Sequence, residues 1–362
     1  MDDVTPSQPL PTTTHWLGRR VLLTGHTGFK GAWLALWLRR LGAEVLGISL
    51  PGEPASPRLW DELGHLGVAE VEADLAEPGW ENHVRAFAPD VVMHLAAQAL
   101  VPLGYREPLR TFASNVMGTA RILDVASSLA SVSVALMVTT DKVYDPRQAP
   151  PHTEADFLGG HDPYAASKAA AELVVASWPR SDTRVVTARA GNVIGGGDWS
   201  PDRLVPDLIR AWAAGESAAL RMPEAIRPWQ HVLQPLHGYL LYAERLSNSP
   251  DLPPALNFGP DESQTVTVGE LVDHAARAWK RDGGTLPSPP TTLSPRPNMV
   301  ETGHLVIDSA LATATLGWHN VIDWRTAADW TIDWYRRPRG ASATAVMDDQ
   351  LSAYQGKVQN CG

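Results

Sequence analysis

Residues 19–31 read RRVLLTGHTGFKG, and this stretch decides the fold. It joins a short apolar run, as in a buried strand, to three glycines and then to a segment of helical period. In this order Gly25 permits a tight turn, Gly28 lets the backbone approach a pyrophosphate, and Gly31 lets helix and strand pack closely. The anion then lies at the N-terminus of the helix. The stretch therefore predicts a dinucleotide-binding loop.

Outward from this loop, short apolar runs alternate with segments of helical period. The runs are EVLGIS (44–49), AEVEAD (69–74), DVVMHLA (90–96), SVSVALMVTT (131–140) and TRVVTARAG (183–191). Such alternation is typical of strands and crossover helices in a parallel sheet. It predicts an α/β fold with a doubly wound parallel sheet, that is, a Rossmann-type NAD-binding lobe.

The regular alternation stops after Gly191, where GGGDW and segments rich in Pro, Trp and Arg follow. We expect a smaller C-terminal substrate-binding lobe there. The predicted boundaries are 19–190 and 232–262 for the NAD-binding lobe and 191–231 and 263–336 for the substrate-binding lobe. Residues 1–18 and 337–362 are expected to be flexible tails.

The composition excludes several classes of protein. The formal net charge of −10 argues against a nucleic-acid surface, which needs clustered Lys and Arg. The single cysteine, Cys361, leaves no intrachain disulfide and no cysteine metal site, and the 12 histidines show no paired spacing, so we expect no metal. No apolar run reaches the roughly 18 residues that cross a bilayer, so we expect a cytoplasmic protein without a membrane partner. Trp33 and Trp37, at helical spacing, are expected in the core or on a dimer face.

The second predicted strand bears on the choice of cofactor. An acidic residue about 20 positions after the glycines binds the adenosine ribose of NAD, but Ser49 occupies that place here and Glu53 comes late. No Arg or Lys lies between Val45 and Ala55 to neutralise the 2′-phosphate of NADP. We therefore expect NAD.

Tyr164 and Lys168, in DPYAASK, are four residues apart on a predicted helix and share one face. A lysine ammonium beside a phenol stabilises the phenolate and lowers the tyrosine pKa, which makes it a usable base. The pair follows a strand that ends in Thr139-Thr140-Asp141-Lys142. Together with the glycine loop, this combination predicts a catalytic site.

The chain resembles the extended short-chain dehydrogenase/reductases, and within them the 4,6-dehydratases that act on CDP-glucose. The resemblance covers roughly residues 19–335, and its most distinctive segments are GNVIGGGDW (191–199) and RPWQHVLQPL (227–236). It implies tightly held NAD, a nucleotide-sugar substrate between two lobes, and a homodimer or homotetramer. The family usually reads QPLVRxSY where this chain reads QALVPLGY (98–105), so an arginine and a serine are missing.

The resemblance also implies the site residues. Those expected at NAD are Gly25, Thr27, Gly28, Phe29, Lys30, Gly31, Ser49, Asp74, Leu75, Leu95, Ala96, Ala97, Asn115, Tyr164 and Lys168. Those expected at the CDP-glucose substrate are Gln98, Asn192, Arg203, Leu204, Arg227 and Arg296. Those expected to be catalytic are Thr140, Asp141, Lys142, Tyr164 and Lys168.

The expected reaction oxidises C4 of the sugar, eliminates water across C5 and C6, and reduces C6, giving CDP-4-keto-6-deoxyglucose. The alternatives are a 4,6-dehydratase of another nucleotide hexose, a nucleotide-sugar 4-epimerase, and a non-catalytic NAD-binding protein. Asp141 and Lys142 favour the dehydratase, because an epimerase needs no acid and base for elimination. The intact set of Thr140, Tyr164 and Lys168 argues against the non-catalytic alternative.

Overall fold

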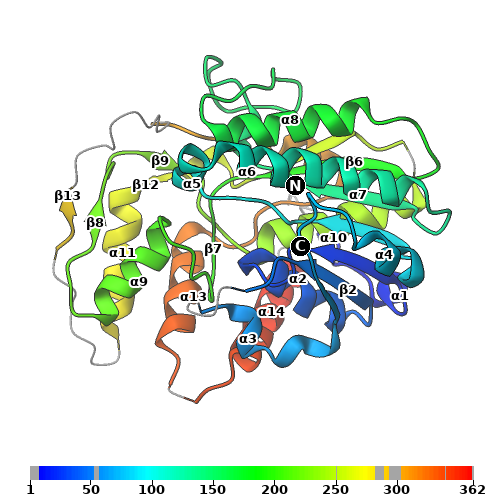
Figure 1. Cartoon of the computed structure of the whole chain (residues 1–362). Helices are drawn as coiled ribbons and strands as arrows, with labels where there is room; N and C mark the ends of the chain where they lie inside the picture. Colours follow the sequence, from blue (N-terminus) through cyan, green and yellow to red (C-terminus); the bar gives the residue numbers. More distant parts are fainter. Residues whose placement is uncertain are drawn as a thin grey trace, which may run out of the picture.

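A seven-stranded parallel sheet forms the centre of the larger lobe (Figure 1). The computed structural model describes residues 8–52, 57–249, 251–281, 289–292, 303–338 and 340–360. The strand order is β11-β6-β5-β4-β1-β2-β3. The strands are β1 (Arg20–Thr24), β2 (Glu44–Ser49), β3 (Ala69–Glu72), β4 (Val91–His94), β5 (Val134–Val138), β6 (Arg184–Ala190) and β11 (Ala255–Phe258). From β1 the next two strands are added on one side and β4, β5, β6 and β11 on the other, so the strand order reverses between β1 and β4. This is the doubly wound arrangement, and the prediction is confirmed.

Helices cover both faces of this sheet, and its inner strands β1, β4 and β5 are accordingly apolar over most of their length, whereas the edge strand β3 is largely exposed. In β1, Val21 and Leu23 belong to the core on one face, and Leu22 belongs to the core on the other. Helices α2 (Phe29–Arg40) and α10 (Leu233–Asn248) pack on the first face, and α4 (Glu81–Phe87), α7 (Gly118–Ser127) and α8 (Pro163–Ser177) on the second. The shorter helical segments of this lobe are α1 (Thr13–Trp16), α3 (Leu59–Glu62), η1 (Gly64–Gly67), α5 (Val101–Arg106), α6 (Pro108–Phe112), η2 (Ala113–Met117) and η3 (Asp141–Val143).

Helix α2 ties the glycine loop to the rest of the core. Trp33 and Trp37 are fully buried, which confirms them as core residues. The indole of Trp33 donates a hydrogen bond of 2.9 Å to the Gly196 carbonyl, so α2 also anchors the segment that leads into the smaller lobe.

The smaller lobe stands beside the carboxyl ends of the sheet, at the left in Figure 1. Helices α9 (Leu204–Ala213), α11 (Val268–Lys280) and α13 (Trp324–Arg336) share an apolar cluster of their own. Short strand pairs join the segments between them: β7 (Val193–Ile194) with β10 (Gln230–His231), β9 (Ile226–Arg227) with β12 (Val266–Thr267), and β8 (Ala219–Leu220) with β13 (Thr291–Thr292). Segment η4 (Glu262–Gln264) precedes β12. Helix α12 (Ala310–Leu316) contacts α10 and β11 of the larger lobe, although its residues were expected in the smaller one.

The prediction of flexible tails is wrong for the described residues at both ends of the chain, which form helices with buried side chains. Residues 343–360 form helix α14, and Met347, Leu351, Tyr354 and Val358 lie on one buried stripe of it. Their spacing of three to four residues places them on one helix face, which packs into the main core. At the other end Trp16 is fully buried and donates to Glu244 at 3.2 Å. Residues 1–7 lie outside the described residues.

The described residues contain no helix with the length and hydropathy that a bilayer span requires. They also contain no cluster of three His, Cys, Asp or Glu side chains that could hold a metal ion.

Candidate active site

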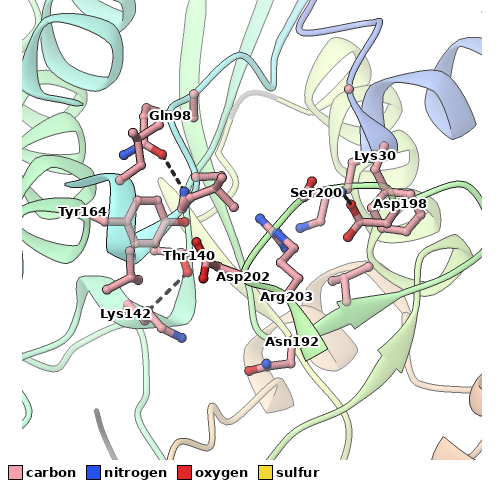
Figure 2. A pocket seen from close by; sticks show the side chains of 18 of the residues that line it. Lys30, Gln98, Thr140, Lys142, Tyr164, Asn192, Asp198, Ser200, Asp202 and Arg203 are labelled. Atoms are coloured by element: carbon pink, nitrogen blue, oxygen red, sulfur yellow. Dashed lines mark hydrogen bonds between the residues drawn. The ribbon is translucent and has the colours of Figure 1, made fainter. Parts of the chain in front are cut away.

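A cavity of about 920 Å³ opens between the two lobes. It runs from the glycine loop across the carboxyl ends of β1, β4 and β5 to α9, β8 and β9. This is where ligands bind in open α/β sheets, because the loops at the point of reversed strand order diverge there. Figure 2 shows Thr140, Lys142 and Tyr164 on one side of the cavity and Arg203 and Asn192 across from them.

The glycine loop has no room for side chains at two of its glycines. A Cβ atom at Gly25, where φ is +74°, would lie 2.7 Å from the Ala96 amide nitrogen. A Cβ atom at Gly31 would lie 2.0 Å from the Gly25 carbonyl oxygen. Helix α2 begins at Phe29, and Gly28 offers no side chain to cap its first amides. The loop and the helix N-terminus therefore fit the pyrophosphate of a dinucleotide.

The end of the cavity where the adenosine is expected is lined by Ser49, Asp74 and Leu75. The Ser49 hydroxyl lies 3.0 Å from His26 Nδ1 and accepts a hydrogen bond of 3.3 Å from the Thr27 amide. Ser49 occupies the end of β2, where NAD-binding folds usually have an acidic residue. Here its hydroxyl instead stabilises the glycine loop through the Thr27 amide.

Arg58 also lines this end of the cavity. It was not predicted, because it lies three residues after the Val45–Ala55 segment, which contains no Arg or Lys. A Cβ atom at Gly52 would lie 2.4 Å from the guanidinium carbon of Arg58, so this side chain lies directly over Gly52. Asp61 accepts a hydrogen bond of 2.7 Å from Arg58. The guanidinium is therefore already partnered by a carboxylate rather than held open for a phosphate.

Tyr164 and Lys168 come from the first turns of α8. Pro163 occupies the first helical position, and the Asp162 side chain caps the helix by accepting a 2.9 Å hydrogen bond from the Ala165 amide. Lys168 is buried, and its ammonium donates to the Val138 carbonyl at 2.8 Å. Burial lowers the pKa of Lys168 to about 8, and the charge of Glu172 acts against that shift.

The expected lowering of the Tyr164 pKa by Lys168 is wrong for this structure. Burial raises the pKa of Tyr164 to about 12, and the contact with Thr140 and the charge of Arg203 only partly offset it. Desolvation of the phenolate outweighs both of these effects. Tyr164 is therefore protonated at neutral pH and needs a partner to accept its proton.

The Thr-Asp-Lys turn lies next to Tyr164. Strand β5 ends at Val138, and the tight turn η3 brings both Asp141 and Lys142 to the cavity, although neighbours in an extended strand would point to opposite sides. The Thr140 hydroxyl donates to Asp141 Oδ1 at 2.9 Å, and Lys142 Nζ lies 3.7 Å from the same oxygen. Asp141 is buried, and its Oδ2 has no hydrogen-bond partner among the described residues.

The far wall of the cavity carries the cations and amides expected at the substrate. Among the described residues, Arg203 Nε and Asn192 Oδ1 are buried without hydrogen-bond partners. Burial and then the charge of Arg203 lower the pKa of Lys30 to about 7, while Asp141 and Asp198 act in the opposite direction. A cationic wall of this kind suits a diphosphate.

Most of the residues predicted from the sequence line the same cavity. They are Gly25, Thr27, Gly28, Phe29, Lys30, Gly31, Ser49, Asp74, Leu75, Leu95, Ala96, Ala97, Gln98, Thr140, Asp141, Lys142, Tyr164, Lys168, Asn192, Arg203, Leu204 and Arg227. Asn115 lies behind the wall, where its side chain accepts from the Gln98 amide at 2.8 Å and donates to Ser167 at 2.8 Å. Arg296 lies outside the described residues.

Several lining residues were not predicted. Asp198, Trp199, Ser200, Asp202, Arg221 and His304 all face the cavity. The first four belong to, or directly follow, the GNVIGGGDW segment, so its distinctive sequence was the available signal. Asp202 has a φ of +59°, a strained value for a residue other than glycine, at the turn that presents Arg203.

Comparison with known proteins agrees with this geometry. The sequence model of the NAD dependent epimerase/dehydratase family matches residues 21–258. CDP-glucose 4,6-dehydratase of Salmonella typhimurium is 38% identical over 318 residues, which cover 84% of this chain and 87% of that protein. dTDP-glucose 4,6-dehydratase of Streptomyces antibioticus is 27% identical over 88% of this chain and 93% of that protein.

Solved structures give the same result for the fold. An NAD-dependent NDP-hexosamine 5,6-dehydratase of tunicamycin biosynthesis superposes with a TM-score of 0.74 at 25% identity, covering 88% of this chain and 99% of that one. UDP-glucose 4-epimerase of Thermotoga maritima superposes with a TM-score of 0.75 at 20% identity, covering 88% and 98%. The glycine loop that fits a dinucleotide and the match over most of the chain lead to one conclusion: this protein belongs to the NAD-dependent epimerase/dehydratase family.

Proposed function

We propose that the protein is an NAD-dependent CDP-glucose 4,6-dehydratase, a hydro-lyase that converts CDP-glucose to CDP-4-keto-6-deoxyglucose. The observation that carries this proposal is the pairing of Asp141 and Lys142 beside Thr140 and Tyr164, in the cavity that also contains the glycine loop. The 38% identity to a CDP-glucose 4,6-dehydratase over 84% of the chain supports the same substrate.

Two groups of residues hold the cofactor and the substrate. The glycine loop and the N-terminus of α2 would hold the pyrophosphate of NAD, which would supply reversible hydride acceptance for the sugar carbons. Arg203, Arg227 and Asn192 bind the diphosphate and orient the hexose against the Thr140 side of the cavity. Holding the sugar in one orientation is a large part of the catalysis.

Proton transfer at the 4-hydroxyl falls to Tyr164 and Thr140. Because the pKa of Tyr164 is raised to about 12, the phenol alone is a poor base, and its proton passes toward Thr140. The Thr140 hydroxyl donates to Asp141 at 2.9 Å, so a path of hydrogen bonds joins the 4-hydroxyl to the Asp141 carboxylate.

Elimination falls to Asp141 and Lys142. The 4-ketone acidifies the C5 proton, which the neutral amine of Lys142 accepts, and the C6 hydroxyl leaves as water with the proton that Asp141 received from the 4-hydroxyl. The buried Oδ2 of Asp141 has no partner among the described residues and is the oxygen available for that transfer. The carbon–oxygen bond at C6 breaks and one water leaves. The C5–C6 double bond that forms would then be reduced at C6 by the hydride taken from C4, while C5 regains a proton from Lys142, which gives the 4-keto-6-deoxy sugar.

Asp141→Asn and Lys142→Met test the division of roles. Both variants should oxidise C4 but slow elimination, so reduced cofactor accumulates after CDP-glucose is added. Lys142→Arg is the matched control. Arginine keeps the positive charge but stays protonated and cannot act as a base, so this variant should slow elimination as well. If elimination proceeds at the native rate in all three variants, the two residues are structural and the 4-epimerase becomes the better proposal.

The nucleotide is tested by separate assays of CDP-, TDP-, UDP- and GDP-glucose. We expect CDP-glucose to give the highest kcat/KM. Equal or better turnover of another nucleotide would move the proposal to a 4,6-dehydratase of that hexose, while the dehydratase class stands.

We also propose that the protein is a homodimer, formed through α6, η2 and α8. These three segments contact one another, and they carry the exposed apolar side chains Leu109, Phe112, Met117 and Leu173. A shared apolar face of this kind suits a second copy of the same face. Light scattering of Leu173→Glu should give a monomer where the native protein gives a dimer, and a native monomer would contradict the proposal. A homotetramer would need a second contact surface besides this one.

The cytoplasmic location stays a prediction.

A further inference from the structure

Directly behind the cavity lies a buried ion pair that the proposed reaction does not use. Glu172 of α8 and Arg189 of β6 are 3% and 4% exposed, and neither lines the cavity. Two hydrogen bonds join them, of 2.9 Å from Arg189 Nε and 2.8 Å from Nη2. Removing two charges from water costs free energy that their attraction seldom fully returns, so a buried pair adds little to stability by itself. A role beyond packing is therefore worth seeking.

The Glu172 carboxylate holds the end of β5 next to the catalytic turn. It accepts hydrogen bonds from the hydroxyls of Thr139 and Thr187, the second at 2.8 Å. Thr139 follows Val138, whose carbonyl accepts from the Lys168 ammonium, and precedes Thr140. Glu172 is also one helical turn after Lys168 and shares its face of α8.

Arg189 holds the other end of the same turn. Its Nη1 donates to the Tyr144 hydroxyl at 2.9 Å, and that hydroxyl donates to Asn257 of β11 at 2.6 Å. Tyr144 is the residue that closes η3, the turn that carries Asp141 and Lys142. One ion pair therefore fixes both ends of the segment from Thr139 to Tyr144.

The charges around Lys168 come from several elements. Tyr164 and Glu172 lie on its own helix, Lys30 on α2, and Asp141 on η3. His94 of β4 is neutral, because burial lowers its pKa to about 3, and Arg189 of β6 is paired. Glu172 is the group whose charge counters the effect of burial on the Lys168 pKa.

We propose that Glu172, fixed by Arg189, is a positioning residue for the proton chemistry of the cavity: it keeps Lys168 protonated and holds the turn from Thr139 to Tyr144 in place. This inference rests on the proposed role of Tyr164 in proton transfer and on the catalytic role expected of Lys168 on the same helix face. Glu172 touches neither substrate nor cofactor and acts through its neighbours.

Glu172→Gln removes the negative charge and keeps the length of the side chain, whereas Glu172→Asp keeps the charge and shortens the side chain. In the glutamine variant Lys168 loses its stabilising anion, so the alkaline limb of the pH profile for C4 oxidation should move to lower pH by about one unit. In the aspartate variant the charge stays, so kcat falls because the hydrogen bonds lengthen, but the limb stays at its native pH. Asp90→Asn is the matched control, because it removes an ion pair with Arg20 far from the cavity and should lower stability without moving the limb.

A uniform loss of kcat in Glu172→Gln, with the alkaline limb at its native pH, would overturn the inference and leave the pair a structural one. If this variant does not fold with an unpaired Arg189, the double variant Glu172→Gln/Arg189→Gln removes both charges and should still move the limb downward. The pH dependence of NAD affinity gives a second readout, since Lys168 is expected at the cofactor. If the wild type turns over no nucleotide hexose but this affinity midpoint still shifts in Glu172→Gln, the proposed function fails and the inference on Glu172 stands. An unshifted midpoint overturns the inference by itself.

Discussion

Gly31→Ala is the most direct perturbation of the cofactor site. The new Cβ atom would lie 2.0 Å from the Gly25 carbonyl oxygen and 2.8 Å from the His26 Cα atom, both backbone atoms, whereas ordinary contact begins at 3.4 Å. The glycine loop and the first turn of α2 must therefore move apart by more than 1 Å. Overpacking of this size costs about 1 to 3 kcal/mol of folding free energy. Displacing the amides proposed to bind the pyrophosphate should lose at least one hydrogen bond to a charged group, worth about 1.5 to 3 kcal/mol, which weakens NAD binding roughly 10- to 100-fold.

The assay is NAD affinity by calorimetry, together with a thermal melt of the protein without added cofactor. Gly356→Ala is the matched control, since nothing lies within 4 Å of a Cβ atom there and the residue is inside α14. Alanine in a helix interior should stabilise that variant by about 0.5 to 1 kcal/mol and leave NAD affinity unchanged. Native NAD affinity in Gly31→Ala would refute the account of the loop.

Three further predictions concern the reaction and the core. Tyr164→Phe should keep NAD binding and lower turnover by roughly 10² or more, and a native rate would remove Tyr164 from the mechanism. Because the pKa of Lys168 lies near 8, its charge is present below that pH and lost above it, so C4 oxidation should decline as the pH rises through about 8. Lys168→Arg stays charged and should lose this decline; if the decline persists, another group causes it. Met347→Ala should cost about 2 to 5 kcal/mol in a denaturant titration, because Met347 is fully buried in the main core; a change within error would mean that α14 does not dock.

The larger lobe was predictable because its signals are local. A buried parallel strand is apolar on both faces, and the glycines mark a turn that other residues cannot make, so β1, the loop and α2 could be placed from residues 19–41. Helix α14 was missed because its composition is small and polar. Its four buried positions gain their stability from packing against the core, which local propensity does not report.

Site residues could be predicted where they lie close together in the sequence. They could not be predicted where residues from distant segments come together in the fold. Tyr164 and Lys168 share a helix face, and Thr140 to Lys142 share a turn. Arg58 reaches the cavity by lying over Gly52, and Glu172 meets Arg189 across two elements, which no spacing along the chain indicates. The raised pKa of Tyr164 follows from desolvation, which depends on the whole cavity wall.

The central claim is that the chain removes water from a CDP-hexose, and incubation with CDP-glucose in deuterated water tests it most directly. The product is examined by mass spectrometry and proton NMR. The expected product is CDP-4-keto-6-deoxyglucose, which has lost one water and carries deuterium at C5 because the proton returned by Lys142 would come from the solvent. Formation of CDP-galactose with no loss of water and no deuterium at C5 would contradict it and make the protein a 4-epimerase.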